Sequence, residues 1–127
     1  MSAPVLDTSA LLAWLRAEPG AETVQPVLGD AVINTVNWAE LARKLVQNGV
    51  EARRTLERLQ VLGLGVEPFT AADALRTGEL WPVTKPFGLS LGDCACLATA
   101  LRLHSQVLTA DQAWKALDLD LDIQLIR

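Results

Sequence analysis

Four acidic residues stand where a carboxylate could take part in chemistry, because each lies beside the end of an apolar run or the start of a helical run: Asp7, Glu40, Asp93 and Asp111. Like charges that lie close together raise one another's pKa unless a positive group compensates them. Lys and Arg are absent from the segments that carry three of these acids, residues 5–15, 89–101 and 107–114. Carboxylate and water oxygens are the ligands of Mg²⁺ or Mn²⁺. If the acids meet, the residue types predict a metal site.

Each acid also has a purely local explanation. Asp7 and Asp111 could cap the helices that follow them, and Asp93 follows a serine at the spacing of a capping box. Glu40 stands in a similar relation to Asn37. Acids in a first helical turn are stabilised by the helix dipole in any case. A chemical role therefore depends on all four acids being brought to one place.

Two strand ends explain how Asp7 and Asp111 can meet. Val5–Leu6 is a short apolar strand that stops at Asp7, and residues 106–109 form another that ends two residues before Asp111. Parallel strands have their carboxyl ends at the same edge of a sheet, where ligands bind in open α/β folds. We therefore expect both carboxylates at that edge.

Glu40 and Asp93 reach the same edge through their helices. Glu40 lies one turn into a helix predicted over residues 36–47, which starts from the carboxyl end of the strand 31–33. The helix predicted over residues 90–104 precedes a parallel strand, so in a right-handed crossover it runs antiparallel to that strand. About 14 helical residues span roughly 21 Å, enough to cross a sheet. The first turn of that helix, which contains Asp93, therefore returns to the edge.

Strands that alternate with helices predict an α/β fold with a mostly parallel central sheet flanked by helices. A length of 127 residues suits one compact domain. A strand is also expected at 66–69, ended or kept at a sheet edge by Pro68, and another at 121–126. Further helices are expected over residues 10–15 (capped by Thr8 or Ser9), 21–28 (which Pro26 could shorten or kink), 50–62, 71–80 and 111–117. The two prolines of 81–88 predict an irregular segment.

The composition excludes several kinds of protein and of binding site. A net charge of −4 gives no general attraction for nucleic acid, so any such contact needs a local basic patch or a metal. No apolar run is long enough to span a membrane and no signal peptide is recognisable, so we expect a cytoplasmic protein. Cys94 and Cys96 are not a CxxC pair, and the single histidine cannot complete a zinc site. We expect both cysteines to be buried.

Four segments resemble the acidic motifs of a known nuclease family. Leu6–Leu11 is similar to the opening segment of PIN-domain nucleases, and Asn37–Leu41 is similar to their second acidic segment. Leu89–Ala98 resembles the third acidic segment of VapC-type toxins, and Val107–Asp111 resembles the fourth. The motifs follow the family's order over essentially the whole chain.

The resemblance implies that residues 1–127 form a single nuclease domain with the PIN-like three-layer α/β fold. It further implies a Mg²⁺-dependent endoribonuclease, with Mn²⁺ as a possible substitute, that is the toxin of a type II toxin–antitoxin pair. Asp7, Glu40, Asp93 and Asp111 would bind the metal and catalyse hydrolysis of RNA phosphodiester bonds. A homodimer and a cognate antitoxin that blocks the site are also implied.

The polar neighbours of the acids have open roles. Thr8, Ser9 and Thr109 could orient the carboxylates by hydrogen bonds, or they could be ordinary cap and turn residues. Asn37, beside Trp38, departs from the family pattern, and its role is open. The residue types fit one metal ion or two.

Basic and aromatic side chains offer contacts for RNA. The helical pair predicted over residues 36–62 carries five basic residues that could contact the RNA backbone or form a solvated face beside acidic neighbours: Arg43, Lys44, Arg53, Arg54 and Arg58. Four tryptophans could stack on unpaired bases or anchor the core: Trp14, Trp38, Trp81 and Trp114.

Three other protein classes place acids in a similar way. A phosphoacceptor receiver domain needs a lysine after its last strands, and residues 107–111 contain none. A haloacid-dehalogenase-type phosphatase needs a second aspartate where this chain has Ser9. The third alternative is a non-enzymatic binding module whose acidic pocket receives a basic side chain of a partner protein. Metal-dependent cleavage of RNA separates that alternative from a nuclease.

Overall fold

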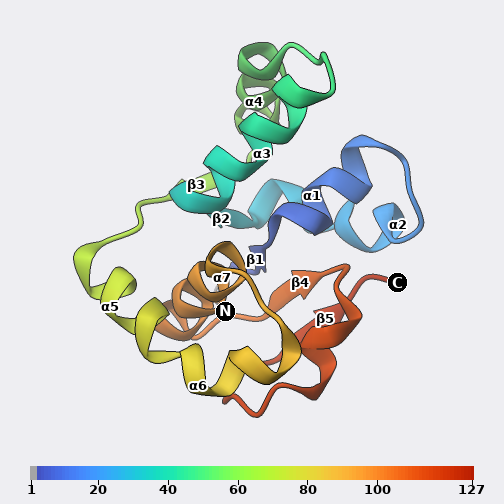
Figure 1. The fold of residues 1–127 in the computed structure, drawn as a ribbon. Helices are drawn as coiled ribbons and strands as arrows, with labels where there is room; N and C mark the ends of the chain where they lie inside the picture. The colour runs from blue at the N-terminus through green and yellow to red at the C-terminus, as the bar shows by residue number, and fades with distance from the viewer. Residues whose placement is uncertain (1–2) are drawn as a thin grey trace.

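A parallel five-stranded sheet forms the centre of the computed structural model, which describes residues 3–127 (Figure 1). Met1 and Ser2 of the predicted domain lie outside the described residues. The strand order is β3-β2-β1-β4-β5. The strands are β1 (Val5–Leu6), β2 (Val32–Asn34), β3 (Gly65–Glu67), β4 (Val107–Thr109) and β5 (Ile123–Leu125). β3 lies at a sheet edge, as the proline at position 68 predicts.

Helices occupy most of the chain between the strands. The α-helices are α1 (Thr8–Leu15), α2 (Ala21–Val24), α3 (Thr35–Gln47), α4 (Ala52–Val61), α5 (Ala71–Glu79), α6 (Trp81–Thr84) and α7 (Leu91–Leu103). Three 3₁₀ turns complete the fold: η1 (Leu28–Asp30), η2 (Lys85–Phe87) and η3 (Gln112–Ala116). The predicted α/β class with a parallel sheet between helices is confirmed.

Strand register decides which residues meet at the edge of the sheet. Val5 of β1 pairs in parallel with Val32 of β2 on one side and with Val107 of β4 on the other. The carboxyl ends of the three central strands therefore lie side by side. Asp7 follows one of these ends directly.

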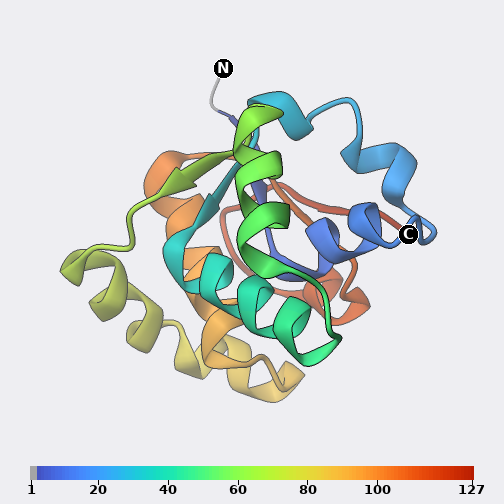
Figure 2. The same ribbon diagram turned by 90° about the horizontal axis from the view of Figure 1, so that it is seen from above.

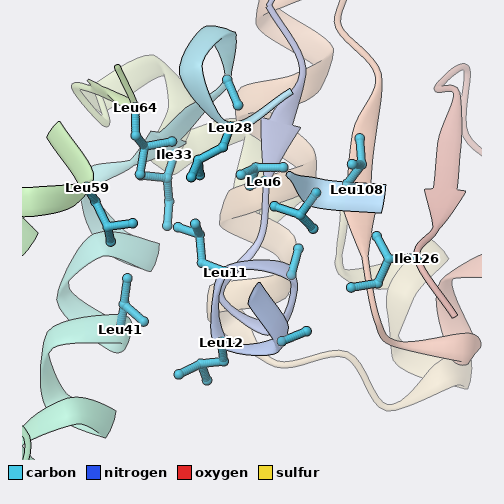
Figure 3. Packing of buried hydrophobic residues seen from close by; sticks show 14 of the residues in the cluster. Leu6, Leu11, Leu12, Leu28, Ile33, Leu41, Leu59, Leu64, Leu108 and Ile126 are labelled. Atoms are coloured by element: carbon cyan, nitrogen blue, oxygen red, sulfur yellow. The ribbon is translucent and has the colours of Figure 1, made fainter. Parts of the chain in front are cut away.

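One face of the sheet carries the larger part of the apolar core (Figure 3). Side chains alternate between the two faces along a strand. Leu6, Ile33 and Leu108 all point to this face, where Leu11 of α1 and Leu41 of α3 pack against them. α3 and α4 lie side by side as the predicted helical pair on this side of the sheet (Figure 2).

The alternate strand residues face α7 on the other side of the sheet. Val5 and Val107 pack there with Leu97 of α7 and with the fully buried Trp114. α5 packs on the outside of α7. These two packed faces give three layers, and they fix both α1 and α7 relative to the same strand ends.

Two predicted segments differ from the structure. Residues 81–88, predicted to be irregular, form α6 and η2, because each proline stands in the first turn of a helix, where its missing N–H costs nothing. The helix predicted over 21–28 is shorter, in the way that Pro26 indicates: it stops at Val24, and a 3₁₀ turn follows, since Pro26 cannot continue an α-helix.

Both cysteines are free and buried, as predicted. The thiol of Cys94 donates to the hydroxyl of Thr84 at 3.2 Å. Cys96, also in α7, packs in the core between this helix and the sheet. Within residues 3–127, no helix has the length and apolar character needed to cross a bilayer.

Candidate active site

Asp7 is the most deeply fixed of the four acids. It follows β1 directly and is 4% exposed. Of the three residues considered for the cap of α1, Asp7, Thr8 and Ser9, it is Asp7 that caps the helix. Oδ1 accepts hydrogen bonds from the backbone N–H of Ala10 at 2.8 Å and from the hydroxyl of Ser9 at 2.7 Å. Oδ2 accepts from the hydroxyl of Thr109 at 2.6 Å. The cap therefore leaves both oxygens held in one orientation at the end of the strand.

The environment of Asp7 favours its protonated form. Burial, with a smaller effect from the charge of Asp93, raises its pKa from 3.8 to about 6, although the hydrogen bonds from Thr109, Ser9 and Ala10 act to lower it. A carboxylate that only caps a helix does not require a raised pKa, because the cap hydrogen bond itself favours the ionised form. Perturbed acids of this kind gather at functional sites.

Asp93 lies in the first turn of α7 as one half of a capping box. Its Oδ2 accepts from the backbone N–H of Ser90 at 2.9 Å, and the Ser90 hydroxyl accepts from the Asp93 N–H at 3.1 Å. Burial raises the pKa of Asp93; the hydrogen bonds from Ser90 oppose this, and the charges of Asp111 and Glu40 add to the rise. These charge effects place the three acids within electrostatic reach of one another.

A second capping box in the chain shows what a purely structural acid looks like. Asp73 stands in α5 where Asp93 stands in α7, and Thr70 takes the place of Ser90. Asp73 is paired with Arg102 at 2.8 Å. Burial acts to raise its pKa, but the hydrogen bonds with Arg102 and Thr70, together with the charge of Arg102, outweigh burial and lower the pKa. Asp93 lacks such a partner in the part of the chain that the structure describes, where ion pairs involve only Arg102 and Arg127.

Glu40 and Asp111 complete the group from α3 and from the start of η3. Oε1 of Glu40 accepts hydrogen bonds from the hydroxyl of Thr8 at 3.1 Å and from Nδ2 of Asn37 at 2.7 Å. Oδ1 of Asp111 accepts from the backbone N–H of Ala113 at 3.0 Å, so Asp111 caps η3. The local explanation therefore holds for Asp111 and coexists with the convergence of the acids. A capping arrangement of Glu40 with Asn37 is wrong, because Asn34 caps α3 by accepting from the backbone N–H of Asn37.

One hollow collects these side chains, and we call it the acid pocket. It encloses about 160 Å³ and is lined by Asp7, Thr8, Ser9, Asn37, Glu40, Lys44, Ser90, Asp93 and Asp111. The structure thus brings together all four acids expected from the sequence. It also places Thr8 and Ser9 in contact with the carboxylates, and Thr109 just beneath them.

Residues 5–119 match the sequence pattern of the PIN domain. That match spans most of the 127 residues. The chain belongs to the PIN-domain family. The resemblance of its four acidic segments to this family is therefore confirmed. Each of these segments contributes its acid to the lining of the acid pocket.

Solved structures share the fold at low sequence identity. A chain of a toxin–antitoxin complex from Klebsiella pneumoniae is 18% identical, with a TM-score of 0.73 over 91% of this PIN domain and 92% of that chain. DNA-bound VapBC from Salmonella typhimurium gives 16% identity and a TM-score of 0.73, with 100% of each chain covered. FitAcB from Neisseria gonorrhoeae gives 23% identity and a TM-score of 0.71, with 97% of each chain covered. Curated protein sequences give no match.

Gly92 and Lys44 were not predicted to lie beside the acids of the PIN domain's acid pocket, and the role of Asn37 was left open. Asn37 binds Glu40, Gly92 lies against the Glu40 carboxylate, and Lys44 lines the pocket one helical turn after Glu40. The Glu40–Lys44 spacing of four residues is a signal available in the sequence, since such pairs share a helix face. Gly92 and Asn37 lie 55 residues apart, and no local pattern joins them.

The donor set fits a hard divalent cation that keeps part of its water shell. No group of three or more His, Cys, Asp or Glu residues among positions 3–127 lies close enough to enclose a metal. Mg²⁺ is bound by one or two carboxylates together with several waters, so close contact with all four acids is not required. The acid pocket has room for several waters, and carboxylate and hydroxyl groups form most of its lining.

Proposed function

We propose that this PIN domain is a metal-dependent endoribonuclease that hydrolyses RNA phosphodiester bonds and is the toxin of a type II toxin–antitoxin pair. The observation that carries the proposal is the convergence of four carboxylates in the acid pocket, with the pKa values of Asp7 and Asp93 raised and no ion-pair partner for them in the described chain. Membership of the PIN-domain family supports it. Residues 1–127 would act as one nuclease domain.

Asp7, Glu40, Asp93 and Asp111 would hold Mg²⁺, for which Mn²⁺ could substitute. A divalent cation polarises a phosphoryl oxygen and makes hydroxide available near neutral pH. The chain's own hydroxyls orient the acids: Thr8 holds Glu40, while Ser9 and Thr109 hold Asp7. A carboxylate of the pocket not occupied by the cation can accept the proton released by the attacking water. We propose that the protein acts on RNA in the cytoplasm.

An antitoxin is the partner that the structural relatives suggest, because they come from toxin–antitoxin complexes. A groove of about 230 Å³ between α1, α3 and α4 suits an apolar segment of such a partner, since most of its surface is apolar and its lining includes Trp14, Leu15 and the exposed Leu62. We propose that the antitoxin covers this groove and that one of its basic side chains enters the acid pocket. An Arg or Lys there would form charge-assisted hydrogen bonds with the acids.

A homodimer would cover a second apolar surface. Trp81 and Leu91 are 59% and 76% exposed and line one hollow beside the first turn of α7. Exposed apolar groups gathered in this way favour contact with another protein surface. Leu91→Glu should turn the dimer into a monomer in light scattering, and a wild-type chain that is already monomeric contradicts this part of the proposal.

Cleavage of single-stranded RNA by the purified chain tests the activity. We expect cleavage with Mg²⁺ or Mn²⁺ and none in EDTA, with activity restored when the metal is returned. Full activity after rigorous removal of metal contradicts the metal-dependent mechanism. No cleavage with any metal, together with tight binding of an arginine-bearing peptide in the acid pocket, would favour the non-enzymatic binding module.

A further inference from the structure

The carboxylate of Glu40 lies in a space that exists only because position 92 is glycine. A Cβ atom on Gly92 would lie 2.3 Å from Oε2, 2.6 Å from Cδ and 2.7 Å from Oε1 of Glu40. Real contacts of a Cβ atom are not this short, so alanine and the present Glu40 position exclude each other. The closest atoms belong to the functional end of an acid in the proposed metal site, and not to a neighbouring backbone.

The backbone of Gly92 gives no other reason for glycine. It lies in the first turn of α7, and its φ is not among the positive values found for glycines 20, 49, 63 and 88. Alanine is more favourable than glycine inside a helix. The side-chain space taken by the Glu40 carboxylate therefore accounts for the residue type at position 92.

Asn37 fixes the other side of the same carboxylate. Its Nδ2 donates to Oε1 of Glu40 at 2.7 Å and to the carbonyl oxygen of Gly92 at 3.0 Å. Both partners are acceptors, so the amide nitrogen and not the amide oxygen must face them. Oδ1 of Asn37 is left buried without a partner in the described structure. The side chain is thus oriented for its two donor hydrogens, at the expense of its acceptor.

These contacts join three parts of the acid pocket. Thr8 follows Asp7, Gly92 precedes Asp93, and Asn37 lies one helical turn before Glu40. The hydrogen bonds of Thr8 and Asn37 both end on Oε1, so Oε2 receives neither. The Glu40 carboxylate is held in one orientation between α1, α3 and α7.

We propose that Asn37 and Gly92 are positioning residues, which form a closed slot that presents Oε2 of Glu40 to the divalent cation. The inference rests on the proposed function, since the cation is its reason. Asn37 sets the rotation of the carboxylate, and Gly92 allows α7 to approach it. Both residues act through the Glu40 carboxylate, which they contact or make room for.

Gly92→Ala tests the slot, with Gly78→Ala as the matched control. Gly78 is also helical, in α5, and a Cβ there meets nothing within 4 Å. We expect Gly92→Ala to weaken Mn²⁺ binding, measured by calorimetry, by about tenfold or more, the size of effect seen when supporting residues of metal ligands are changed. Asn37→Ala should weaken it similarly. Gly78→Ala should raise the melting temperature and leave Mn²⁺ binding unchanged.

The Glu40→Ala background separates the slot from a general disturbance of α7. Without the Glu40 carboxylate a methyl group at position 92 meets no obstacle, so Gly92→Ala should cause no further loss of Mn²⁺ binding and should raise the melting temperature. If Gly92→Ala alone does not fold, its rescue by Glu40→Ala supports the slot and a failure of rescue overturns it. Unchanged Mn²⁺ affinity in Gly92→Ala overturns the inference while the proposed function stands. A wild-type chain that binds no Mn²⁺ overturns the proposed function, and the inference with it.

Discussion

Thr109 donates its hydroxyl hydrogen to Oδ2 of Asp7 across 2.6 Å and so joins the ends of the neighbouring strands β4 and β1. The same hydroxyl oxygen accepts from the backbone N–H of Asp111 at 3.0 Å. One fully buried side chain therefore fixes two of the four acids. Its hydrogen bond also acts to lower the pKa of Asp7, against the effect of burial.

Thr109→Val should raise the pKa of Asp7 above its wild-type value. Valine keeps the shape of threonine but cannot donate, so the ionised form of Asp7 loses a charge-assisted hydrogen bond. We expect metal affinity, followed as Mn²⁺ binding across pH 5–9, to develop at higher pH than in wild type. Stability at pH 8 should fall by about 1–3 kcal/mol, as for a buried polar group that loses its partner.

Thr77→Val is the control for this change. Thr77 is also buried, and its hydroxyl donates to the carbonyl oxygen of Asp73 at 2.7 Å inside α5, outside the acid pocket. The control should lose some stability without moving the pH profile of Mn²⁺ binding. Identical pH profiles for Thr109→Val and wild type would show that the hydroxyl has no influence on Asp7.

Asp7 should give the metal-free protein a stability that falls as pH rises. Its pKa is about 6 in the folded chain, against an ordinary value of 3.8. Between these values the folded chain keeps a proton that the unfolded chain has released, so the free energy of unfolding decreases with rising pH. A pKa unit corresponds to about 1.4 kcal/mol, which makes the full loss on the order of 3 kcal/mol above pH 6.

Urea unfolding in EDTA from pH 4 to pH 8 measures this loss as the difference between wild type and Asp7→Asn. Other acids titrate in both proteins, so only the difference reports on Asp7. Added Mg²⁺ should recover the wild-type stability above pH 6, because a ligand that binds the folded state stabilises it. Parallel pH curves for the two proteins would contradict the raised pKa.

The convergence of the acids followed from simple rules of sheet geometry. Asp7 and Asp111 stand just past the ends of two strands, and the predicted parallel pairing places those ends together. The first turn of α7 returns to the same edge because a crossover helix runs antiparallel to its strands. The alternation of strands and helices along the chain was therefore sufficient to predict the parallel sheet and the meeting of the four acids at its edge.

Contacts between single side chains could not be predicted in the same way. The slot for Glu40 depends on a glycine in α7 and an amide in α3 that lie 55 residues apart, so no local pattern of the sequence joins them. The identity of the α1 cap depends on which of three adjacent polar residues turns toward Ala10, and Asp7 does so because Thr109 and Ser9 hold it there. α6 was not predicted because a proline in the sequence can mark either a break or the first turn of a helix, and here it lies in a first turn.

Asp93→Asn and Asp73→Asn should have opposite consequences, although both residues occupy the same position of a capping box. An asparagine oxygen can still accept the cap hydrogen bond in either helix. At position 93 the change removes charge from a crowded anionic pocket, so stability in EDTA should hold or rise while RNA cleavage falls by roughly 100-fold or more. At position 73 it removes the charge of the buried partner of Arg102, which keeps only Glu67, and should cost about 1–3 kcal/mol with cleavage unchanged.

Thermal or urea unfolding and initial rates of RNA cleavage for the two variants decide the comparison. Near-native cleavage by Asp93→Asn would assign Asp93 to capping alone. A loss of stability in Asp93→Asn equal to that in Asp73→Asn would show that the acids do not repel one another in the metal-free pocket.

Lys44 is the one basic residue that lines the acid pocket, and no ion pair involves it in the described chain. It lies one helical turn after Glu40, with its side chain exposed on α3. An ammonium group beside a metal site and free of a carboxylate partner is available to a phosphate of the substrate. A phosphate contact strengthens binding and adds to its dependence on salt.

Lys44→Gln should therefore raise KM for single-stranded RNA several-fold, with a smaller change in kcat, because one uniform binding contact is lost. The slope of log affinity against log salt concentration should become shallower by about 0.7, the value for one contact to a single strand. Arg43→Gln is the matched control, since Arg43 is the exposed neighbour of Lys44 on α3 and does not line the pocket. It should change KM much less. The opposite pattern, with KM unchanged and the melting temperature lowered only in EDTA, would mean that Lys44 instead balances the acids when no cation is bound.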